Sequence, residues 1–447
     1  MIEPADWDAV QECARVVEKL HITSPDRRDG REIAHSTYFQ IAQLQGNTAL
    51  FSALRTLHIN TPESLKDPAA LSHLSLFLSP TLASITILRL EYNAAGSLAR
   101  FLNINGRGPL TTLILHSFEL SPFLAASISQ CQSLEILDLK VNGQLEYLSV
   151  QDVLSAPRLS NVKLNTQEAE YSGVFPTQAA STAGIRVGEI GQIHLDGSIL
   201  MVENVITATT KRTMPSFTII SYSSDATTIQ DLLRYIAAQQ ANIRNLTINL
   251  ENTLIIDASF LSSLISANAF HELRTLAFLG LAFRRLDQDL PQMLSHWQHI
   301  RHLSFGTVVD TIGSISLATL KLVAQSCPNL RIFEAPFDSA GTFNPPGGIS
   351  DCLLSHKLLE LSFQEFEPSR SRNNHRPLSS ETTQRVARYI YALFPDLDNI
   401  KTHACHLHGY DHWMPVAESY KLFQSFCRRE FKELNNMRQH QLDGAGD

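Results

Sequence analysis

The chain has 447 residues, of which 44% are hydrophobic and 18% are charged, so it can bury a large core and is not globally disordered. Its 36 basic and 44 acidic residues give a net charge of −8, which leaves no bulk positive field to hold nucleic acid or an anionic membrane. We therefore expect neither among its partners. The six cysteines include no Cys-x-x-Cys pair, and this excludes a disulfide framework or a zinc-finger scaffold.

The first 22 residues (1–22) predict a capping helix followed by half a repeat, VEKLHI (17–22). Trp7, Val10, Ala14 and Val17 fall on one face of that helix. Acidic residues precede the first basic one and no long apolar run follows, so we expect no signal peptide. No later segment approaches the ~18 consecutive apolar residues of a spanning helix. These features favour a cytoplasmic or nuclear location.

An internal repeat organises most of the chain. Its motif is an apolar residue, two others, an apolar residue, one other and an apolar residue. Five copies start 24 to 31 residues apart, and five more start 27 to 30 apart. In order they read LRTLHI (54–59), ITILRL (85–90), LTTLIL (110–115), LEILDL (134–139), LSNVKL (159–164), IRNLTI (243–248), LRTLAF (273–278), IRHLSF (300–305), LRIFEA (330–335) and LLELSF (358–363).

This spacing is typical of the longer leucine-rich repeats. Each motif predicts a short strand with inward-pointing apolar residues, and the intervening segment returns as an outer helix. Thr61-Pro62 and Ser121-Pro122 are cap and first-turn pairs that predict helix starts. We therefore predict an α/β fold: a leucine-rich-repeat solenoid, or horseshoe, with a parallel concave sheet and about 10 to 13 repeats over 23–402. IGQIHL (190–195) and the stretch 214–219 are poorer matches that would fill the gap between the two groups.

Three regions differ from the repeats. Two segments, 165–189 and 366–381, lack an apolar period and predict long loops. In the C-terminal region, 403–447, an amphipathic helix is predicted to cap the last repeat. Its apolar face consists of Trp413, Val416, Tyr420, Phe423 and Cys427.

The sequence offers no catalytic motif: it has no phosphate-binding Gly-Lys-Ser/Thr loop, nucleophile elbow or His-Glu-x-x-His helix. We expect a protein that is not an enzyme and needs no cofactor. HACHLHGYDH (403–412) gathers possible metal ligands, but such crowded ligands need a further group to close a tetrahedral site. We interpret it as a connection between helical stretches rather than a zinc site. Cys131 and Cys327 precede their motifs by three residues, and we interpret them as buried structural thiols rather than reactive ones.

The concave surface remains as a candidate site. The third, fifth and seventh positions of each motif alternate with the buried ones and should line the concave sheet. Their mixed charge favours an unidentified target protein or peptide, although such residues also solvate a sheet that binds nothing. The predicted partner-binding residues are Arg89, Glu91, Asp138, Lys140, Lys163, His194, Asp196, Asn245, Thr247, Asn249, His302, Glu334 and Glu360.

Four stretches resemble the F-box/leucine-rich-repeat-like proteins of mushroom-forming fungi (basidiomycetes). They are the opening segment with Asp6-Trp7 (2–22), LVAQSCPNLRIFEAPF (322–337), RVARYIYALFPDLDNIKT (385–402) and WMPVAESYKLFQSF (413–426). Together they span nearly the whole chain. The resemblance implies the substrate-recognition part of a ubiquitin-ligase adaptor, in which the repeats hold the target protein.

The F-box that this family carries before the Asp-Trp pair is missing, because only six residues precede Trp7. LPQMLSHW (290–297) is superficially similar to an F-box but leads directly into the motif at 300. We therefore expect binding to a ligase adaptor only if upstream F-box sequence exists. Two alternatives remain open: a free-standing repeat scaffold or inhibitor unrelated to ubiquitin, and a repeat-based GTPase activator, for which the sequence offers no distinctive catalytic arginine.

Overall fold

A computed structural model gives the fold. Contacts divide the chain into two compact units, Met1–Ser221 and Tyr222–Asp447, and each is described by itself. The residues that the structure describes are 4–23, 35–45, 49–60, 73–90, 92–172, 189–209, 213–222, 225–239, 242–266, 270–306, 314–337, 356–364, 378–403 and 413–443.

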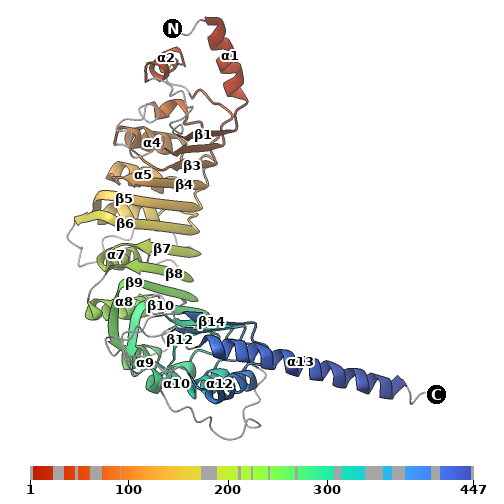
Figure 1. Cartoon of the computed structure of the whole chain (residues 1–447). Helices are drawn as coiled ribbons and strands as arrows, with labels where there is room; N and C mark the ends of the chain where they lie inside the picture. The colour runs from red at the N-terminus through yellow and green to blue at the C-terminus, as the bar shows by residue number, and fades with distance from the viewer. Residues whose placement is uncertain are drawn as a thin grey trace. The chain divides into compact units, whose positions relative to one another are not determined.

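Parallel strands follow one another in chain order within each unit (Figure 1). Fourteen strands lie in the described residues, eight in the first unit and six in the second. The first eight are β1 (Lys19–Thr23), β2 (Thr56–Asn60), β3 (Ser84–Ile87), β4 (Thr112–Phe118), β5 (Ile136–Glu146), β6 (Asn161–Ser172), β7 (Gln192–Asp196) and β8 (Ser216–Ser221). The other six are β9 (Asn245–Asp257), β10 (Thr275–Arg284), β11 (His302–Phe305), β12 (Ile332–Pro336), β13 (Glu360–Gln364) and β14 (Asn399–His403).

Helices connect most of the strands, and in the first unit α4, α5 and α7 lie on one side of the sheet (Figure 1). The helices of that unit are α1 (Pro4–Arg15), α2 (His35–Gln45), α4 (Tyr92–Asn105), α5 (Pro122–Ser129), α6 (Tyr147–Leu154) and α7 (Ile199–Ala208), with a short 3₁₀ turn, η1 (Leu74–Leu76). Those of the second unit are α8 (Ala226–Gln239), α9 (Ala258–Ser266), α10 (Leu286–Leu294), α11 (Thr319–Ser326), α12 (Ser380–Leu393) and α13 (Met414–Asp443). The predicted helix start at Ser121-Pro122 is confirmed, since the Ser121 hydroxyl caps α5 by accepting a bond from the Leu124 amide.

The strands bury alternate residues, as the motif predicts. Leu113 and Leu115 of β4 are fully buried, and Leu137 of β5 is 1% exposed. Asp138, between Leu137 and Leu139, is half-exposed. The first, fourth and sixth motif positions therefore point into the core, and the positions between them point to the opposite face of the sheet.

The predicted α/β architecture with an open parallel sheet and repeated strand-helix units is confirmed at this level. Of the fourteen described strands, thirteen (β2 to β14) begin within 23–402, where 10 to 13 repeats are expected from the sequence. The two poor matches at 190–195 and 214–219 form β7 and β8. The half repeat at 17–22 forms β1, which pairs with β2.

One motif was assigned in the wrong register. Strand pairing places Ile85 beside Leu57 and Leu113, so the repeat is LASITI (82–87) instead of ITILRL (85–90). Leu82, Ile85, Ile87 and Leu90 are all buried, so apolarity alone fits both readings. Motif starts at 54, 82 and 110 are then evenly 28 residues apart. Arg89 consequently lies in a bend after β3, not at an alternating strand position, and Glu91 lies outside the described residues.

The predicted loop at 165–189 is wrong for its first eight residues. β6 continues to Ser172 because β5 is also long, and after a register shift Asn142 to Glu146 pair with Glu168 to Ser172. Backbone pairing thus sustains a strand that has no apolar period. Residues 173–188 of that segment, and 366–377 of the other predicted loop, lie outside the described residues.

In the second unit, the predicted C-terminal helix packs against the strand β13 and the end of α12. The Trp413 ring, 1% exposed, stacks on Phe363 of β13 with ring centroids 4.3 Å apart. The Tyr420 hydroxyl donates a hydrogen bond to the carbonyl of Phe394, which follows α12 (2.7 Å). Trp413 directly precedes α13 and Tyr420 belongs to its first part, and the helix then continues away from the strands of this unit (Figure 1).

Candidate functional site

The candidate site is the open face of the sheet, which we define as the face formed by the third, fifth and seventh motif positions. Parallel in-register pairing lines up equal positions of successive repeats. Asp138 of β5 lies beside Lys163 of β6, and Lys163 lies beside His194 of β7. At the seventh position, Lys140 lies beside Asn165, which lies beside Asp196. Residues that are distant in the sequence therefore form rows across the strands.

In the first unit these rows form the first open-face patch: His116, Asp138, Lys163, Asn165, Gln167, His194 and Asp196. Its central group is the Asp138 carboxylate, 22% exposed. One carboxylate oxygen lies 3.3 Å from His116 Nε2, and the other lies 3.6 Å from Lys163 Nζ. The lysine side chain is 48% exposed, so this charge pair is accessible from solvent.

Asp196 is the most buried charged group of the first open-face patch, with 8% of its surface exposed. Two side-chain amides satisfy it: Asn165 Nδ2 donates to one oxygen (2.8 Å) and Gln167 Nε2 to the other (2.7 Å). A buried carboxylate needs such bonds, because leaving it unpaired would cost several kcal/mol. The three side chains therefore hold one another in fixed positions.

His194 lies between these groups. Burial lowers the pKa of its imidazole below the ordinary value, and the nearby Lys163 ammonium lowers it further. The Asp196 and Asp138 carboxylates oppose this shift but do not reverse it. At neutral pH the ring is therefore predominantly neutral, with one nitrogen able to donate and the other able to accept a hydrogen bond.

In the second unit, a separate group forms the second open-face patch: His302, Ser304, Glu334, Glu360 and Lys401. The hydroxyl of Ser304, which is fully buried, donates to Glu334 Oε2 (2.6 Å). Lys401 Nζ lies 2.6 Å from Glu360 Oε1, and the hydrogen bond to Glu360 raises the pKa of this lysine. Neighbouring strands supply these residues: Ser304 of β11 lies beside Glu334 of β12, and Glu360 and Lys401 come from the paired strands β13 and β14.

His302 belongs to the same patch. Burial lowers its pKa, against the opposing effect of Glu334 and Glu360. Its Nε2 is buried and makes no hydrogen bond to the described residues. His302 is therefore a half-buried imidazole whose unbonded Nε2 is closed off from solvent.

The other predicted site residues are not gathered with these. Asn245, Thr247 and Asn249 lie half-buried at the open face of β9, and Lys140 is half-buried on β5. Arg89 is displaced by the register correction described above. Five patch members were missed by the sequence analysis: His116, Asn165, Gln167, Ser304 and Lys401. The alternation rule itself identifies most of them, because His116 and Asn165 are seventh-position residues and Ser304 is a fifth-position residue.

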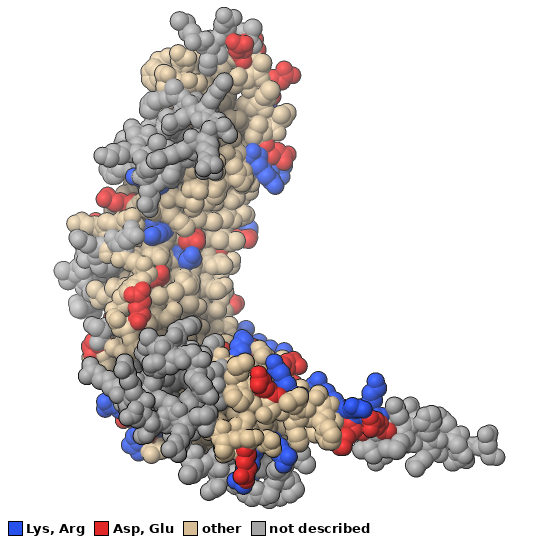
Figure 2. Space-filling view, in the orientation of Figure 1, with Lys and Arg blue, Asp and Glu red and all other residues tan. Residues whose placement is uncertain are grey.

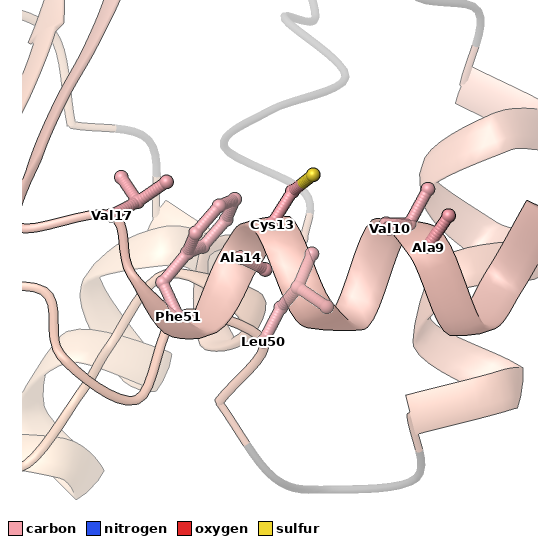
Figure 3. Close-up of a pocket in the computed structure, with 7 residues that line it drawn as sticks. All are labelled: Ala9, Val10, Cys13, Ala14, Val17, Leu50 and Phe51. Atoms are coloured by element: carbon pink, nitrogen blue, oxygen red, sulfur yellow. The ribbon is translucent and has the colours of Figure 1, made fainter.

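A different kind of surface lies at the N-terminal helix. The predicted capping face of α1 is only partly buried: Ala14 is 3% exposed, whereas Val10 is 38% exposed. Between α1 and Leu50-Phe51 lies a groove of ≈ 360 Å³, lined by the apolar or thiol side chains drawn in Figure 3. The lining residues are Ala9, Val10, Cys13, Ala14, Val17, Leu50 and Phe51. The capping prediction for this end is therefore correct for Ala14 and wrong for Val10.

The buried cysteines and the possible metal ligands do not indicate a catalytic site. Cys131 and Cys327 are buried, and burial raises the pKa of each thiol to about 12, which suppresses the nucleophilic thiolate. Across the described stretches, no group of three or more His, Cys, Asp or Glu side chains could hold a metal ion. Residues 404–412 of the histidine-rich segment lie outside those stretches.

On the face seen in Figure 2, acidic and basic side chains are scattered among uncharged ones. No helix in the described residues is both long enough and apolar enough to cross a membrane. Comparison with known sequences gives no family: no protein-family model and no curated protein matches the chain.

Proposed function

We propose that this protein is a non-catalytic recognition protein, a leucine-rich-repeat solenoid that binds a target protein through the open face of its sheet. The repeated motif supports the leucine-rich-repeat assignment, together with strands that follow the chain order in each unit. In such an architecture each repeat adds one strand to a continuous face, which suits the capture of an extended or convex partner surface.

The observation that supports this proposal best is the first open-face patch. Asp138, His116 and Lys163 come from three successive strands, and their side chains bond to one another while remaining partly exposed. Strands position side chains more rigidly than loops do, so a partner meets groups that are already oriented. Catalytic groups usually converge on an enclosed pocket, whereas these are spread along a row of strands.

We further propose that the target is a substrate of a ubiquitin ligase, with this chain corresponding to the recognition region of an F-box adaptor. The resemblance of the segments around Asp6-Trp7 and within 385–426 supports this assignment. The open face would then hold the substrate, and ligase docking would belong to a separate module.

The experiment is affinity capture from cell extract with quantitative mass spectrometry. The wild-type protein is compared with Asp138→Ala/Lys163→Ala and with Asp231→Ala/Arg234→Ala. The second variant is a matched control, because it also removes one exposed acid–base pair, located on α8 (2.5 Å). We expect the patch variant to lose specific captured proteins that the control retains. Identical captured sets for all three proteins would contradict recognition through this patch.

The ubiquitin part is tested separately by the identity of the captured proteins and by their turnover. If the chain recognises ligase substrates, proteins lost with the patch variant should be ubiquitylated and should accumulate when the protein is depleted. If the ubiquitylation and turnover of the captured proteins do not change, the protein is a recognition scaffold and the ligase assignment is refuted.

A further inference from the structure

The second unit carries a row of arginines that do not belong to the open face. Arginine occupies the second position of four successive motifs, IRNLTI, LRTLAF, IRHLSF and LRIFEA. We call these residues, Arg244, Arg274, Arg301 and Arg331, the arginine ladder. They directly precede the strands β9, β10, β11 and β12, so they lie at the edge where the strands begin.

Backbone hydrogen bonds hold the arginine ladder in register. The Arg274 amide donates to the Arg244 carbonyl (2.6 Å), and the Arg301 amide donates to that of Arg274 (2.7 Å). The Arg331 amide continues the series to Arg301 (2.8 Å). Neighbouring arginines are therefore one strand spacing apart, about 4.8 Å, and the four span about 14 Å.

All four side chains of the arginine ladder are exposed. Within the described part of the chain, none of them forms an ion pair with a carboxylate. The nearest acidic residue in sequence, Glu272, faces His271 instead (3.9 Å). Beyond Arg331 the equivalent positions hold Leu359 and then Asp398, so the row of positive charge ends there.

Four like charges at this spacing repel one another, because residues directly opposite on neighbouring strands interact. An anion that bridges them would remove this repulsion. Guanidinium groups bind carboxylates in a planar, bidentate geometry. The ladder spreads its donors along a line, which suits several carboxylates in succession better than one phosphate, whose capture requires donors that converge on a point.

We propose that the arginine ladder binds an acidic peptide segment of a protein partner, a run of Asp or Glu residues in extended conformation. A length of about 14 Å corresponds to about four residues of extended chain. The net charge of −8 repels a nucleic acid, with its long and dense row of phosphates, more strongly than a short acidic segment. This edge is distinct from the open face, so the proposal stands or falls independently of the function proposed above.

The test measures binding of a fluorescein-labelled octaglutamate peptide to the full chain by fluorescence anisotropy. Arg274→Gln/Arg301→Gln removes the centre of the ladder and should weaken binding at least tenfold. The matched control is Arg55→Gln/Arg100→Gln, which changes net charge equally. Arg55 has the same motif position in the first unit but lies between Glu18 and Ala83, and Arg100 is exposed on α4. The control should bind within twofold of wild type, and both variants should keep the wild-type melting temperature.

Four results would overturn the proposal. If the wild-type protein does not bind octaglutamate detectably, the ladder is not a site for acidic peptides. If the ladder and control variants lose octaglutamate affinity equally, the effect comes from net charge and not from the arginine ladder. Tighter ladder-dependent binding of polyuridine RNA, or of a peptide with a single phosphoserine, would assign the row to another class of anion. The open-face variant Asp138→Ala/Lys163→Ala should bind octaglutamate like wild type. A loss of binding in this variant would show that the peptide binds the open face instead of the ladder.

Discussion

The first and second open-face patches have the same formal charge, two carboxylates against one lysine, but they distribute it differently. In the first, each carboxylate has two described partners: His116 and Lys163 hold Asp138, and two amides hold Asp196. In the second, each has one: Ser304 for Glu334 and Lys401 for Glu360. The two patches therefore have equal net charge and differ in the number of partners that each carboxylate has.

This difference bears on recognition. A carboxylate whose two oxygens each have a partner offers less to a binding protein than one that has a partner on a single oxygen. The first patch is thus preorganised and largely self-satisfied, whereas in the second one oxygen of Glu334 makes no hydrogen bond to the described residues. Partner groups that donate hydrogen bonds or carry positive charge fit the second patch better.

The largest effects should come from the core beneath both patches. Leu137→Asp under the first and Phe333→Asp under the second each bury an unpaired charge, which should lower the free energy of unfolding by about 4 kcal/mol or more. Asp138→Ala, one residue away from Leu137, should cost about 1 kcal/mol or less. Urea unfolding of the three variants checks this. Similar midpoints for Leu137→Asp and Asp138→Ala would contradict the strand register.

A second contrast concerns the caps of the two units. Trp413 is buried against Phe363, so Trp413→Ala should destabilise the second unit by about 3–5 kcal/mol. Trp7 is only half-buried on α1, and Trp7→Ala should cost about 1 kcal/mol. Thermal melts followed by circular dichroism compare them. A Trp7 effect as large as that of Trp413 would mean that α1 seals its end as tightly as α13 does.

Acidification should weaken the fold through His302 of the second open-face patch. The pKa of His302 is lowered by burial, while in the unfolded chain it returns to about 6.5. The unfolded state then binds more protons, so stability is full above that value and is lost as pH falls through it. His302→Gln should make the stability between pH 7.5 and 5.5 less dependent on pH, by an amount smaller than the core effects. Exposed His299→Gln is the control, and an equal flattening by both would assign the effect elsewhere.

The smallest effects should separate the two carboxylates themselves. Asp138→Asn removes the charge that faces Lys163 and should cost up to about 1 kcal/mol, less in high salt. Glu334→Gln keeps an acceptor for the Ser304 hydroxyl and should stay within about 0.5 kcal/mol of wild type. Denaturant titrations at low and high salt measure both. A larger, salt-sensitive loss for Glu334→Gln would reverse the comparison of the patches.

The sequence predicts the strands well because burial at three motif positions is a local signal. It fails at ITILRL, where Leu82, Ile85, Ile87 and Leu90 are all buried and only pairing with β2 and β4 selects the register. It also fails where strands continue without an apolar period, as in β6 beyond Leu164, because the partner strand supplies the reason for extension.

The candidate site is predicted in part. Alternation correctly places Asp138, Lys163, His194, Glu334 and Glu360 on the open face. Which of them bond to one another depends on side-chain reach across strands, and this is not encoded in spacing. Gln167, for example, lies beyond the motif positions, yet it reaches Asp196 on the next strand. The arginine ladder is visible in the sequence as a repeated second residue, but its register as a row follows only from the backbone bonds.

The order of the strands in the first unit has a consequence for biosynthesis. Each strand pairs with the one translated just before it, as in β4 and β5, where Thr112 lies beside Ile136, 24 residues later. A chain leaving the ribosome therefore always finds the edge that its next strand requires, and no strand waits for a distant partner. From β1 to β8 the sheet can lengthen one repeat at a time during translation, with only the newest strand edge exposed at each moment.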